Sequence, residues 1–356
     1  MIDIPDELIA TQSKYNGETG RAFIAALPRR AAGFLERWGL RRDGAAFHGM
    51  CALVLPVVRE ADGRRAVLKL QPVDEETAGE PVALRVWGEA DAGAVELLDH
   101  DPATGTMLLE RLDGGRSLAE MADEREAVRV LAGLLARLSS VPAPPGCGLR
   151  RLGDVVARLL EEAPGAAEAL SDEAERRLLA DCAAALREVA GEPGDRMLHW
   201  DLHYGNVLAR EVCEAGGVRE AGGTGRASRT GRGLGRVRDV DPGRWGAIGR
   251  WAPHGRRVAG ERWAPDERWV AIDPKPLIGD PGFELLPALV NRFDAGAVRW
   301  RFDLLTEALG LDRERERARA WTLGRLLQNG LWAVSEGERR LDPEQVEIAR
   351  VLLGRG

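Results

Sequence analysis

The stretch LHWDLHYGNVL, residues 198–208, holds two histidines, an aspartate and an asparagine between apolar residues. His199, Asp201 and His203 alternate along the chain, so an extended backbone would direct all three side chains to one side. Such a set could bind a metal ion and support a metal-dependent hydrolase. A structural turn with hydrogen-bonded histidines is the alternative that requires no chemistry.

A third interpretation rests on the spacing of Asp201 and Asn206. Four residues separate them, as in the D-x-x-x-x-N pattern of a kinase catalytic loop. In such a loop the carboxylate accepts the proton of the substrate hydroxyl, and the amide oxygen binds Mg²⁺. A kinase also needs a second carboxylate for the metal and a lysine for the nucleotide phosphates.

Both groups occur in suitable surroundings. Asp273 follows a short apolar run in WVAIDPKP, where a strand could deliver its carboxylate to a cleft. Lys69 lies in AVLKL within another predicted strand, and the chain has only two other lysines, Lys14 and Lys275. Glu80 opens the next predicted helix and could either pair with Lys69 or lie on the surface. The sequence therefore favours the kinase over the metal-dependent hydrolase.

The elements that must position these groups change in character along the chain. Apolar residues have helical spacing at 28–46. Large or β-branched apolar residues predict four strands, at 51–58, 65–71, 94–100 and 106–112. Pro81 suits the first turn of a helix between the second and third of these strands. Residues 50–112 thus predict a small sheet with one helix.

A mostly helical half follows this sheet. Apolar stripes of helical period predict further helices around 128–138, 155–160, 178–186, 315–334 and 343–353. Two lobes around a cleft also suit a chain of 356 residues. The sequence therefore predicts an N-terminal nucleotide-binding lobe at 1–112, a hinge near 110–116 and a helical C-terminal catalytic and substrate lobe at 117–356.

One segment fits neither half. Residues 210–268 contain thirteen glycines in 59 residues, many arginines and few aliphatic side chains. Such a composition gains little from burial, so a disordered, solvent-exposed insert is predicted at 211–266. The insert separates Asn206 from Asp273, which lie 67 positions apart.

Composition limits the function further. The chain has a net charge of -7 at pH 7, no apolar run of about 18 residues, and four cysteines without CxxC pairing. These features indicate a cytoplasmic chain with no disulfide framework, no membrane or nucleic-acid partner and no obligate protein partner. Acidic surroundings favour a small, cationic substrate.

The ordered segments VLKL, EPVALRVW, LLERL, LHWDLHYGN and AIDPKPLIGDPGFELLPAL resemble those of the aminoglycoside phosphotransferase superfamily, in its streptomycin 6-kinase and hydroxyurea phosphotransferase branch. The resemblance implies an α+β, two-lobed protein-kinase-like fold, with a small N-terminal β-sheet lobe carrying one helix and a larger, mostly helical C-terminal lobe. It also implies ATP-dependent phosphoryl transfer to a hydroxyl of a small cationic antibiotic, with a streptomycin-type aminoglycoside favoured.

The resemblance assigns the nucleotide contacts to the N-terminal lobe and the hinge. Lys69, with Glu80 as its partner, would bind the phosphates of ATP. Residues Glu110 to Leu112 would form the hinge that contacts adenine.

The same resemblance assigns the reacting groups to the C-terminal lobe. Asp201 would be the catalytic base, and Asn206 with Asp273 would hold Mg²⁺. The family usually has glycine before the catalytic aspartate, whereas this chain has Trp200, whose ring either crowds the loop or packs below it.

Two alternatives to an antibiotic kinase stay open. The chain could phosphorylate another small hydroxyl compound, such as a hydroxyurea-like molecule or a metabolite, or it could bind nucleotide without turnover if Trp200 or the insert disables the loop. The sequence assigns no role to Lys275, nor to Glu284, Asp294 and Asp303, which could line a cationic substrate or lie on solvated faces.

Overall fold

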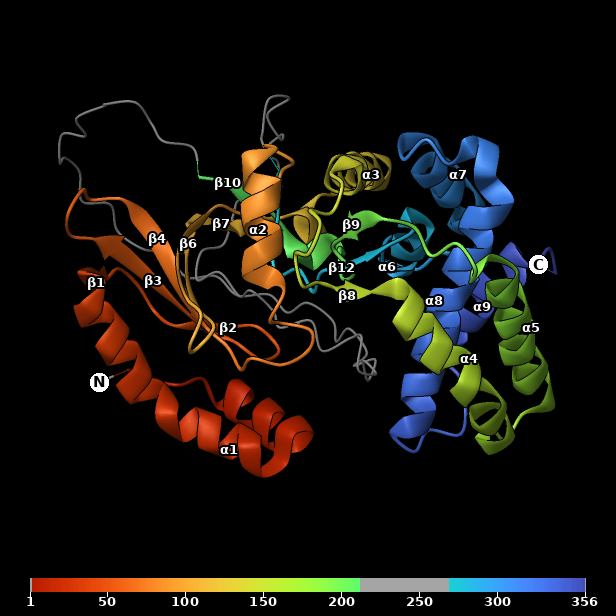
Figure 1. The fold of residues 1–356 in the computed structure, drawn as a ribbon, viewed down its shortest axis with the longest axis horizontal. Helices are drawn as coiled ribbons and strands as arrows, with labels where there is room; N and C mark the ends of the chain where they lie inside the picture. Colours follow the sequence, from red (N-terminus) through yellow and green to blue (C-terminus); the bar gives the residue numbers. More distant parts are fainter. Residues whose placement is uncertain (1, 212–268, 356) are drawn as a thin grey trace, which may run out of the picture.

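A computed structural model describes residues 2–211 and 269–355 of the chain. Figure 1 shows a sheet with two helices at one end and a cluster of helices at the other. The α+β, two-lobed architecture with a smaller N-terminal sheet lobe is therefore confirmed, although this lobe carries two helices where the sequence predicted one. The predicted insert at 211–266 lies, apart from Glu211, outside the described residues.

The sheet of the N-terminal lobe has six strands. The strand order is β1-β3-β4-β6-β5, and β2 pairs with β3 at the end of β3 that leads to the cleft. All pairings within it are antiparallel. The strands are β1 (Leu40–Arg42), β2 (Phe47–His48), β3 (Leu53–Arg59), β4 (Arg65–Leu70), β5 (Leu97–Asp101) and β6 (Thr106–Glu110).

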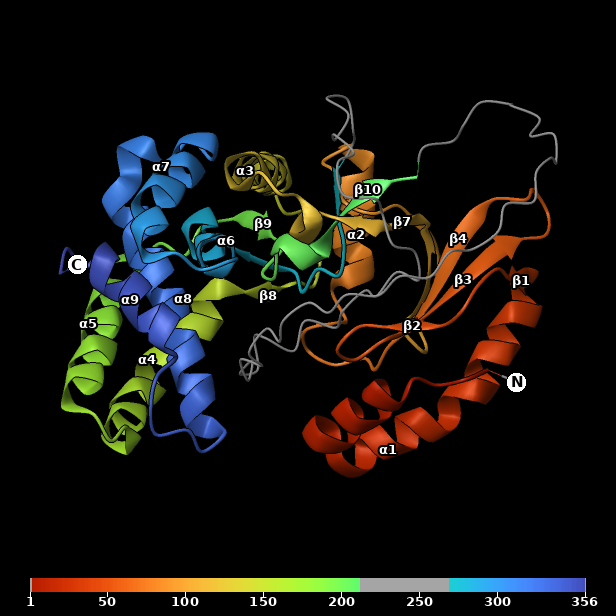
Figure 2. The same ribbon diagram turned by 180° about the vertical axis from the view of Figure 1, so that it is seen from behind.

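The two faces of this sheet are covered differently. Helix α1 (Asp6–Arg37) packs on one face, where it buries alternate residues such as Leu53, Leu55 and Leu68. Helix α2 (Glu80–Glu89) lies on the other face, beside the C-terminal lobe, as Figures 1 and 2 show. Because side chains alternate along a strand, β4 directs Lys69 to the α2 face.

Helix α1 differs from the sequence expectation. The predicted helix at 28–46 begins much earlier, at Asp6, and is interrupted at Gly17, where φ is 53°. It ends at Arg37, and the following residues form β1, which pairs Leu40 with Arg59. Gly39, with φ of 57°, reverses the chain between the two elements. Beyond residue 37 the apolar spacing alone would continue the helix, but pairing with β3 makes these residues a strand.

The C-terminal lobe is built around helix α8, which is buried along most of its length. Helices α4 and α5 pack against α8, and α3 packs against α7. Asp123 and Asp172 cap α3 and α5 by accepting backbone N–H groups of the first turn. The helices are α3 (Glu124–Ser140), α4 (Leu152–Ala169), α5 (Glu173–Val189), α6 (Leu285–Val290), α7 (Val298–Ala308), α8 (Arg315–Ser335) and α9 (Pro343–Leu352). Among the described residues, no helix is long and apolar enough to cross a membrane.

Two small sheets carry the loops of the cleft. The first has the order β11-β10-β7 and the second has the order β8-β12-β9. The predicted hinge near 110–116 coincides largely with β7, which pairs with β10 and so belongs to a sheet. These strands are β7 (Leu112–Ser117), β8 (Arg150–Arg151), β9 (Arg196–Leu198), β10 (Val207–Arg210), β11 (Trp269–Ala271) and β12 (Leu277–Gly279).

Candidate active site

A cavity of about 380 Å³ lies between the lobes. Every site residue expected from the sequence lines it except Glu80, whose carboxylate is buried behind Lys69. One part of the wall is apolar and receives side chains from both lobes: Val54, Val67, Leu109, Leu112, Leu208 and Ile272. A slot of this kind suits a flat, apolar ring system.

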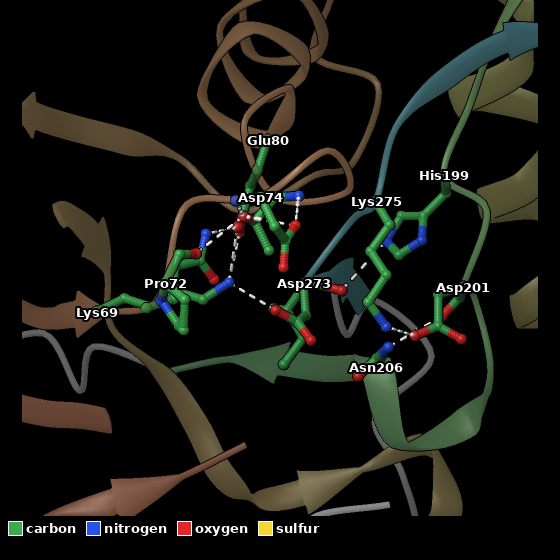
Figure 3. Close-up of polar contacts among 12 residues, drawn as sticks. Lys69, Pro72, Asp74, Glu80, His199, Asp201, Asn206, Asp273 and Lys275 are labelled. Carbon is green, nitrogen blue, oxygen red and sulfur yellow. Dashed lines mark hydrogen bonds and ion pairs between the residues drawn. The ribbon is translucent and has the colours of Figure 1, made fainter. Parts of the chain in front are cut away.

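Lys69 connects two carboxylates at the inner end of the cavity. Its Nζ lies 2.6 Å from Glu80 Oε1 and 2.6 Å from Asp273 Oδ1, as Figure 3 shows. Gln71 donates to Glu80 Oε2 at 2.7 Å. The side chains of Lys69 and Glu80 are only 6% and 1% exposed, whereas that of Asp273 is 40% exposed. The pairing of Lys69 with Glu80, open from the sequence, is thus present and buried.

The charge on Lys69 is maintained by its partners. Burial alone would lower the pKa of Lys69, but the carboxylates of Asp273 and Glu80 raise it above its ordinary value. Burial likewise acts to raise the pKa of Asp273, yet Lys69 and Lys275 outweigh it and lower that pKa. Ammonium and carboxylate therefore both remain ionised at neutral pH.

A β-hairpin brings Asn206 and Asp273 together across the insert. Strands β10 and β11 pair Val207 with Ala271, and the Ile272 N–H donates to the Asn206 carbonyl at 2.9 Å. Asp273 follows directly, with φ of 58°, a left-handed conformation that Asp tolerates better than most residues. Asn206 Nδ2 donates to the carbonyl oxygen of Asp201 at 2.9 Å, so its amide oxygen is the atom left for a ligand.

Asp201 lies at the other end of the cavity and forms an ion pair with Lys275. Lys275 Nζ is 2.7 Å from Asp201 Oδ2, and the two side chains are 30% and 11% exposed. Burial acts to raise the pKa of Asp201, but Lys275 outweighs it and lowers that pKa. Lys275, to which the sequence assigned no role, is thus part of the site.

The two histidines of the loop do not form a metal site with Asp201. His199 Nε2 lies 3.1 Å from the Ile272 carbonyl, while His203 Nδ1 accepts the Gly205 N–H at 3.0 Å. Burial lowers the pKa of both rings, that of His199 to about 4, so both are neutral at pH 7. Within residues 2–211 and 269–355, no group of three His, Cys, Asp or Glu side chains could hold a metal ion. The histidines stabilise the loop instead.

Glu284 is a buried support of this loop that the sequence did not identify. Its carboxylate accepts the N–H groups of His199, at 2.8 Å, and Trp200. Burial raises the pKa of Glu284 to about 7, although these two donors oppose the shift. By contrast, Asp294 caps a short 3-10 helix, and Asp303 forms an exposed ion pair with Arg315. None of these three carboxylates lines the cavity.

Trp200 packs below the loop and does not crowd it. Its φ is 72°, a conformation that favours glycine and strains a bulky side chain. Its buried ring stacks on Phe283 with centroids 5.4 Å apart, and the Arg325 guanidinium lies 4.1 Å from its centroid. Burial of an aromatic ring stabilises by more than the ~1–3 kcal/mol that such strain costs.

Glu110 and Leu112 border the apolar part of the wall at the junction of β6 and β7. The Glu110 carboxylate is occupied by Arg210, at 2.5 Å, and by the Glu96 N–H, at 2.9 Å. This segment therefore contributes to the cavity through its position and backbone, while the Glu110 side chain secures it to β10.

Comparison with solved structures defines the class of protein first. A thermostable mutant of the aminoglycoside phosphotransferase APH(4)-Ia, in a ternary complex with ADP and hygromycin B, superposes with a TM-score of 0.53 and 13% identity, over 91% of this chain and 98% of that one. A Plasmodium vivax ethanolamine kinase superposes with a TM-score of 0.50 and 11% identity, over 99% and 94%. The fold is that of the kinase-like phosphotransferases.

Sequence comparison then gives the family. Residues 37–215 match the model of the "Aminoglycoside/hydroxyurea antibiotic resistance kinase" family. A hydroxyurea phosphotransferase of Kitasatospora aureofaciens is 55% identical, over 100% of this chain and 87% of the relative. Streptomycin 6-kinases of Streptomyces glaucescens and Streptomyces griseus are 48% and 45% identical, each over 99% of this chain and 98% and 97% of the relatives. The chain belongs to the aminoglycoside/hydroxyurea antibiotic resistance kinases.

Proposed function

We propose that this chain transfers the γ-phosphoryl group of ATP to a hydroxyl of a small antibiotic, with Mg²⁺ as cofactor. The observation that supports this most is that Lys69, Asp273 and Asp201 line one cavity. A cation for phosphates, a carboxylate for the metal and a base for the acceptor are the groups that this reaction needs. Dependence on ATP is consistent with action in the cytoplasm.

We assign the adenine ring to the apolar part of the wall. The backbone at Glu110 to Leu112 borders this slot and could hydrogen-bond the ring edge. Lys69 would then contact the phosphates from the α2 face of the N-terminal sheet. Its buried partner Glu80 keeps the ammonium charged and directed into the cavity.

Asn206 and Asp273 fit Mg²⁺ by their chemistry. Mg²⁺ is usually bound by one or two protein oxygens together with water and substrate phosphates. Asp273 is ionised and partly exposed, and the amide oxygen of Asn206 is available because its nitrogen is engaged by Asp201. When held by Asn206 and Asp273, the ion would supply positive charge that offsets the charge of the phosphates.

Asp201 is our candidate for the base that orients the acceptor. Lys275 occupies its Oδ2, and no hydrogen bond among the described residues reaches its Oδ1. A hydroxyl placed against Oδ1 could therefore donate its proton there.

The remaining lining of the cavity favours a cationic acceptor. Asp74 and Glu76, from the loop between β4 and α2, line the cavity, as do Tyr15, Asn16 and Trp332. Carboxylates and aromatic rings are the groups that attract organic cations. With two streptomycin 6-kinases among the relatives, we propose a streptomycin-type aminoglycoside as the substrate. Hydroxyurea is the second candidate, because the 55% identical relative is a hydroxyurea phosphotransferase.

Purified protein with ATP and Mg²⁺ should be incubated with streptomycin and, separately, with hydroxyurea. ADP release and the mass of the phosphorylated product are measured, together with resistance of a sensitive host that expresses the protein. Turnover of streptomycin is the expected result. Turnover of hydroxyurea alone would select the second candidate, and ATP binding without transfer to either compound would contradict the proposal.

A further inference from the structure

Lys275 takes no part in the nucleotide and metal contacts proposed above, yet it lines the same cavity. Its Nζ is 2.7 Å from Asp201 Oδ2, and its segment continues from Asp273, two positions earlier. Figure 3 shows the ammonium directed between Asp201 and Asp273. A positive charge therefore lies between the proposed base and the proposed metal ligand.

The backbone around Lys275 is held firmly. Pro274 and Pro276 flank it and restrict φ on both sides. The Lys275 N–H donates to the His199 carbonyl at 3.0 Å, and Arg150 donates to the Lys275 carbonyl at 3.1 Å. Because both backbone groups are bonded, the side chain extends from a fixed turn, which favours a preorganised electrostatic role.

The ion pair places the ammonium of Lys275 beside the proposed base. In the proposed reaction the acceptor hydroxyl lies against Asp201 and Mg²⁺ is held at Asp273, so the phosphoryl group would be transferred in the space between these two carboxylates. Lys275 lines the cavity there, and its ammonium is therefore placed to contact the group in transfer.

We propose that Lys275 is a catalytic residue whose ammonium contacts the γ-phosphoryl group as this group passes from ATP to the acceptor. This proposal rests on the proposed function. In that step the hydroxyl oxygen bonds to the γ-phosphorus, and the bond from phosphorus to the β,γ-bridging oxygen breaks. ADP leaves with the electron pair of that bond, and the hydroxyl proton goes to Asp201. Lys275 stabilises the charge on the equatorial phosphoryl oxygens.

The use of lysine in this chain agrees with that role. Of 50 basic Lys and Arg residues only three are lysine, and Lys69 and Lys275 both line the cavity. Lysine carries a compact charge on a flexible stem, which can follow a moving group. The planar guanidinium of arginine is better suited to a fixed, bidentate partner.

Lys275→Met tests the role with an acceptor that the wild-type enzyme phosphorylates. We expect kcat to fall by about 10²-fold while the KM for ATP changes less than about threefold. The second measurement is equilibrium binding of ADP with Mg²⁺, with and without aluminium fluoride, which imitates the phosphoryl group in transfer. Wild type should prefer the aluminium fluoride complex, and Lys275→Met should lose the preference but bind ADP normally.

Two further variants complete the experiment. Lys275→Arg should recover part of kcat and part of the aluminium fluoride preference, because it restores the charge. Arg177→Met, which removes an equal charge from the exposed face of α5, should behave as wild type.

The outcomes separate the two proposals. A wild-type protein that transfers phosphate to no acceptor overturns the proposed function. Normal kcat in Lys275→Met overturns the role of Lys275, as does a wild type that binds the two ADP complexes equally. Loss of kcat with the aluminium fluoride preference retained also overturns the contact, since Lys275 would then only position Asp201.

Discussion

The two lysines of the cavity are held in opposite ways. Lys69 projects from the regular strand β4 into a pair with Glu80, and both side chains are almost completely buried. Lys275 projects from the turn between β11 and β12 towards Asp201 and is 30% exposed. The first pair joins a strand to a helix within one lobe, whereas the second joins two loops.

The difference shows which charges belong to the fold and which are available for chemistry. A buried charge without its partner costs several kcal/mol, so the Lys69–Glu80 pair is coupled to folding. Asp201 is also mostly buried, but the side chain of Lys275 is 30% exposed, so water can partly replace its contact with Asp201. Lys275 can therefore exchange that contact for one with a substrate more easily than Lys69 can leave Glu80.

Asp201→Asn removes the carboxylate of the Lys275–Asp201 pair and should have the largest effect on turnover. The amide keeps the shape but cannot accept the hydroxyl proton, so kcat should fall by about 10²–10⁴-fold. Steady-state kinetics and calorimetric ATP binding measure the two consequences, and ATP affinity should stay near that of wild type. Turnover within about threefold of wild type would contradict the role of Asp201 as base.

Lys69→Met should break the buried pair and damage both folding and nucleotide binding. Glu80 would lose its charged partner in the interior, which should lower the free energy of unfolding by about 3–5 kcal/mol. Urea unfolding and ATP titration measure the two effects.

The double variant Lys69→Met/Glu80→Gln sharpens the contrast. It removes the uncompensated carboxylate, so most of the stability should return while ATP binding stays weak. Lys275→Met is the matched variant at the Lys275–Asp201 pair and should lower the free energy of unfolding by less than Lys69→Met, because the side chain of Lys275 is 30% exposed. Equal destabilisation by Lys69→Met and Lys275→Met would refute the distinction between the two pairs.

Asp273→Asn tests the group that faces both lysines. Removing its charge should weaken Mg²⁺-dependent ATP binding by ~10-fold, since Mg²⁺ prefers a carboxylate ligand. ATP affinity is measured across a magnesium titration, with ATP binding in excess EDTA as the control. Titration curves that overlay those of wild type would exclude Asp273 as a metal ligand.

His199 predicts a pH dependence of stability. Its pKa is lowered by burial to about 4 in the folded state against about 6.5 unfolded, so the unfolded chain binds more protons between these values. Stability from this group is complete above pH 6.5 and declines as the pH falls towards 4.

The measurement compares wild type with His199→Gln. Between pH 7 and pH 5 wild type should lose on the order of 2 kcal/mol relative to the variant, which cannot titrate there. Melting temperatures at both pH values give the comparison. If the difference in melting temperature between wild type and His199→Gln is the same at both pH values, His199 is not buried in its neutral form.

Much of the fold follows from periodicity. Alternation in AVLKL placed Lys69 on a strand, and apolar stripes located most helices of the C-terminal lobe. The helix predicted at 28–46 was wrong at both ends, because Leu40 to Arg42 pair with β3 and the first half of α1 lacks a clear stripe. The spacing of apolar residues within a segment does not show whether a distant segment will pair with it as a strand, so it cannot decide between helix and strand there.

By itself the sequence determined the chemical groups of this protein and their order along the chain. Asp201 and Asn206 could be selected by their D-x-x-x-x-N spacing, and Lys69 and Asp273 by the apolar, strand-like segments in which they lie. Only the tertiary structure decided their partners. Lys69 contacts Asp273 across 204 positions, Lys275 contacts Asp201 across 74, and Glu284 supports His199 across 85. Periodicity acts over a few residues, whereas these contacts depend on how strands pair and helices pack after long loops have closed.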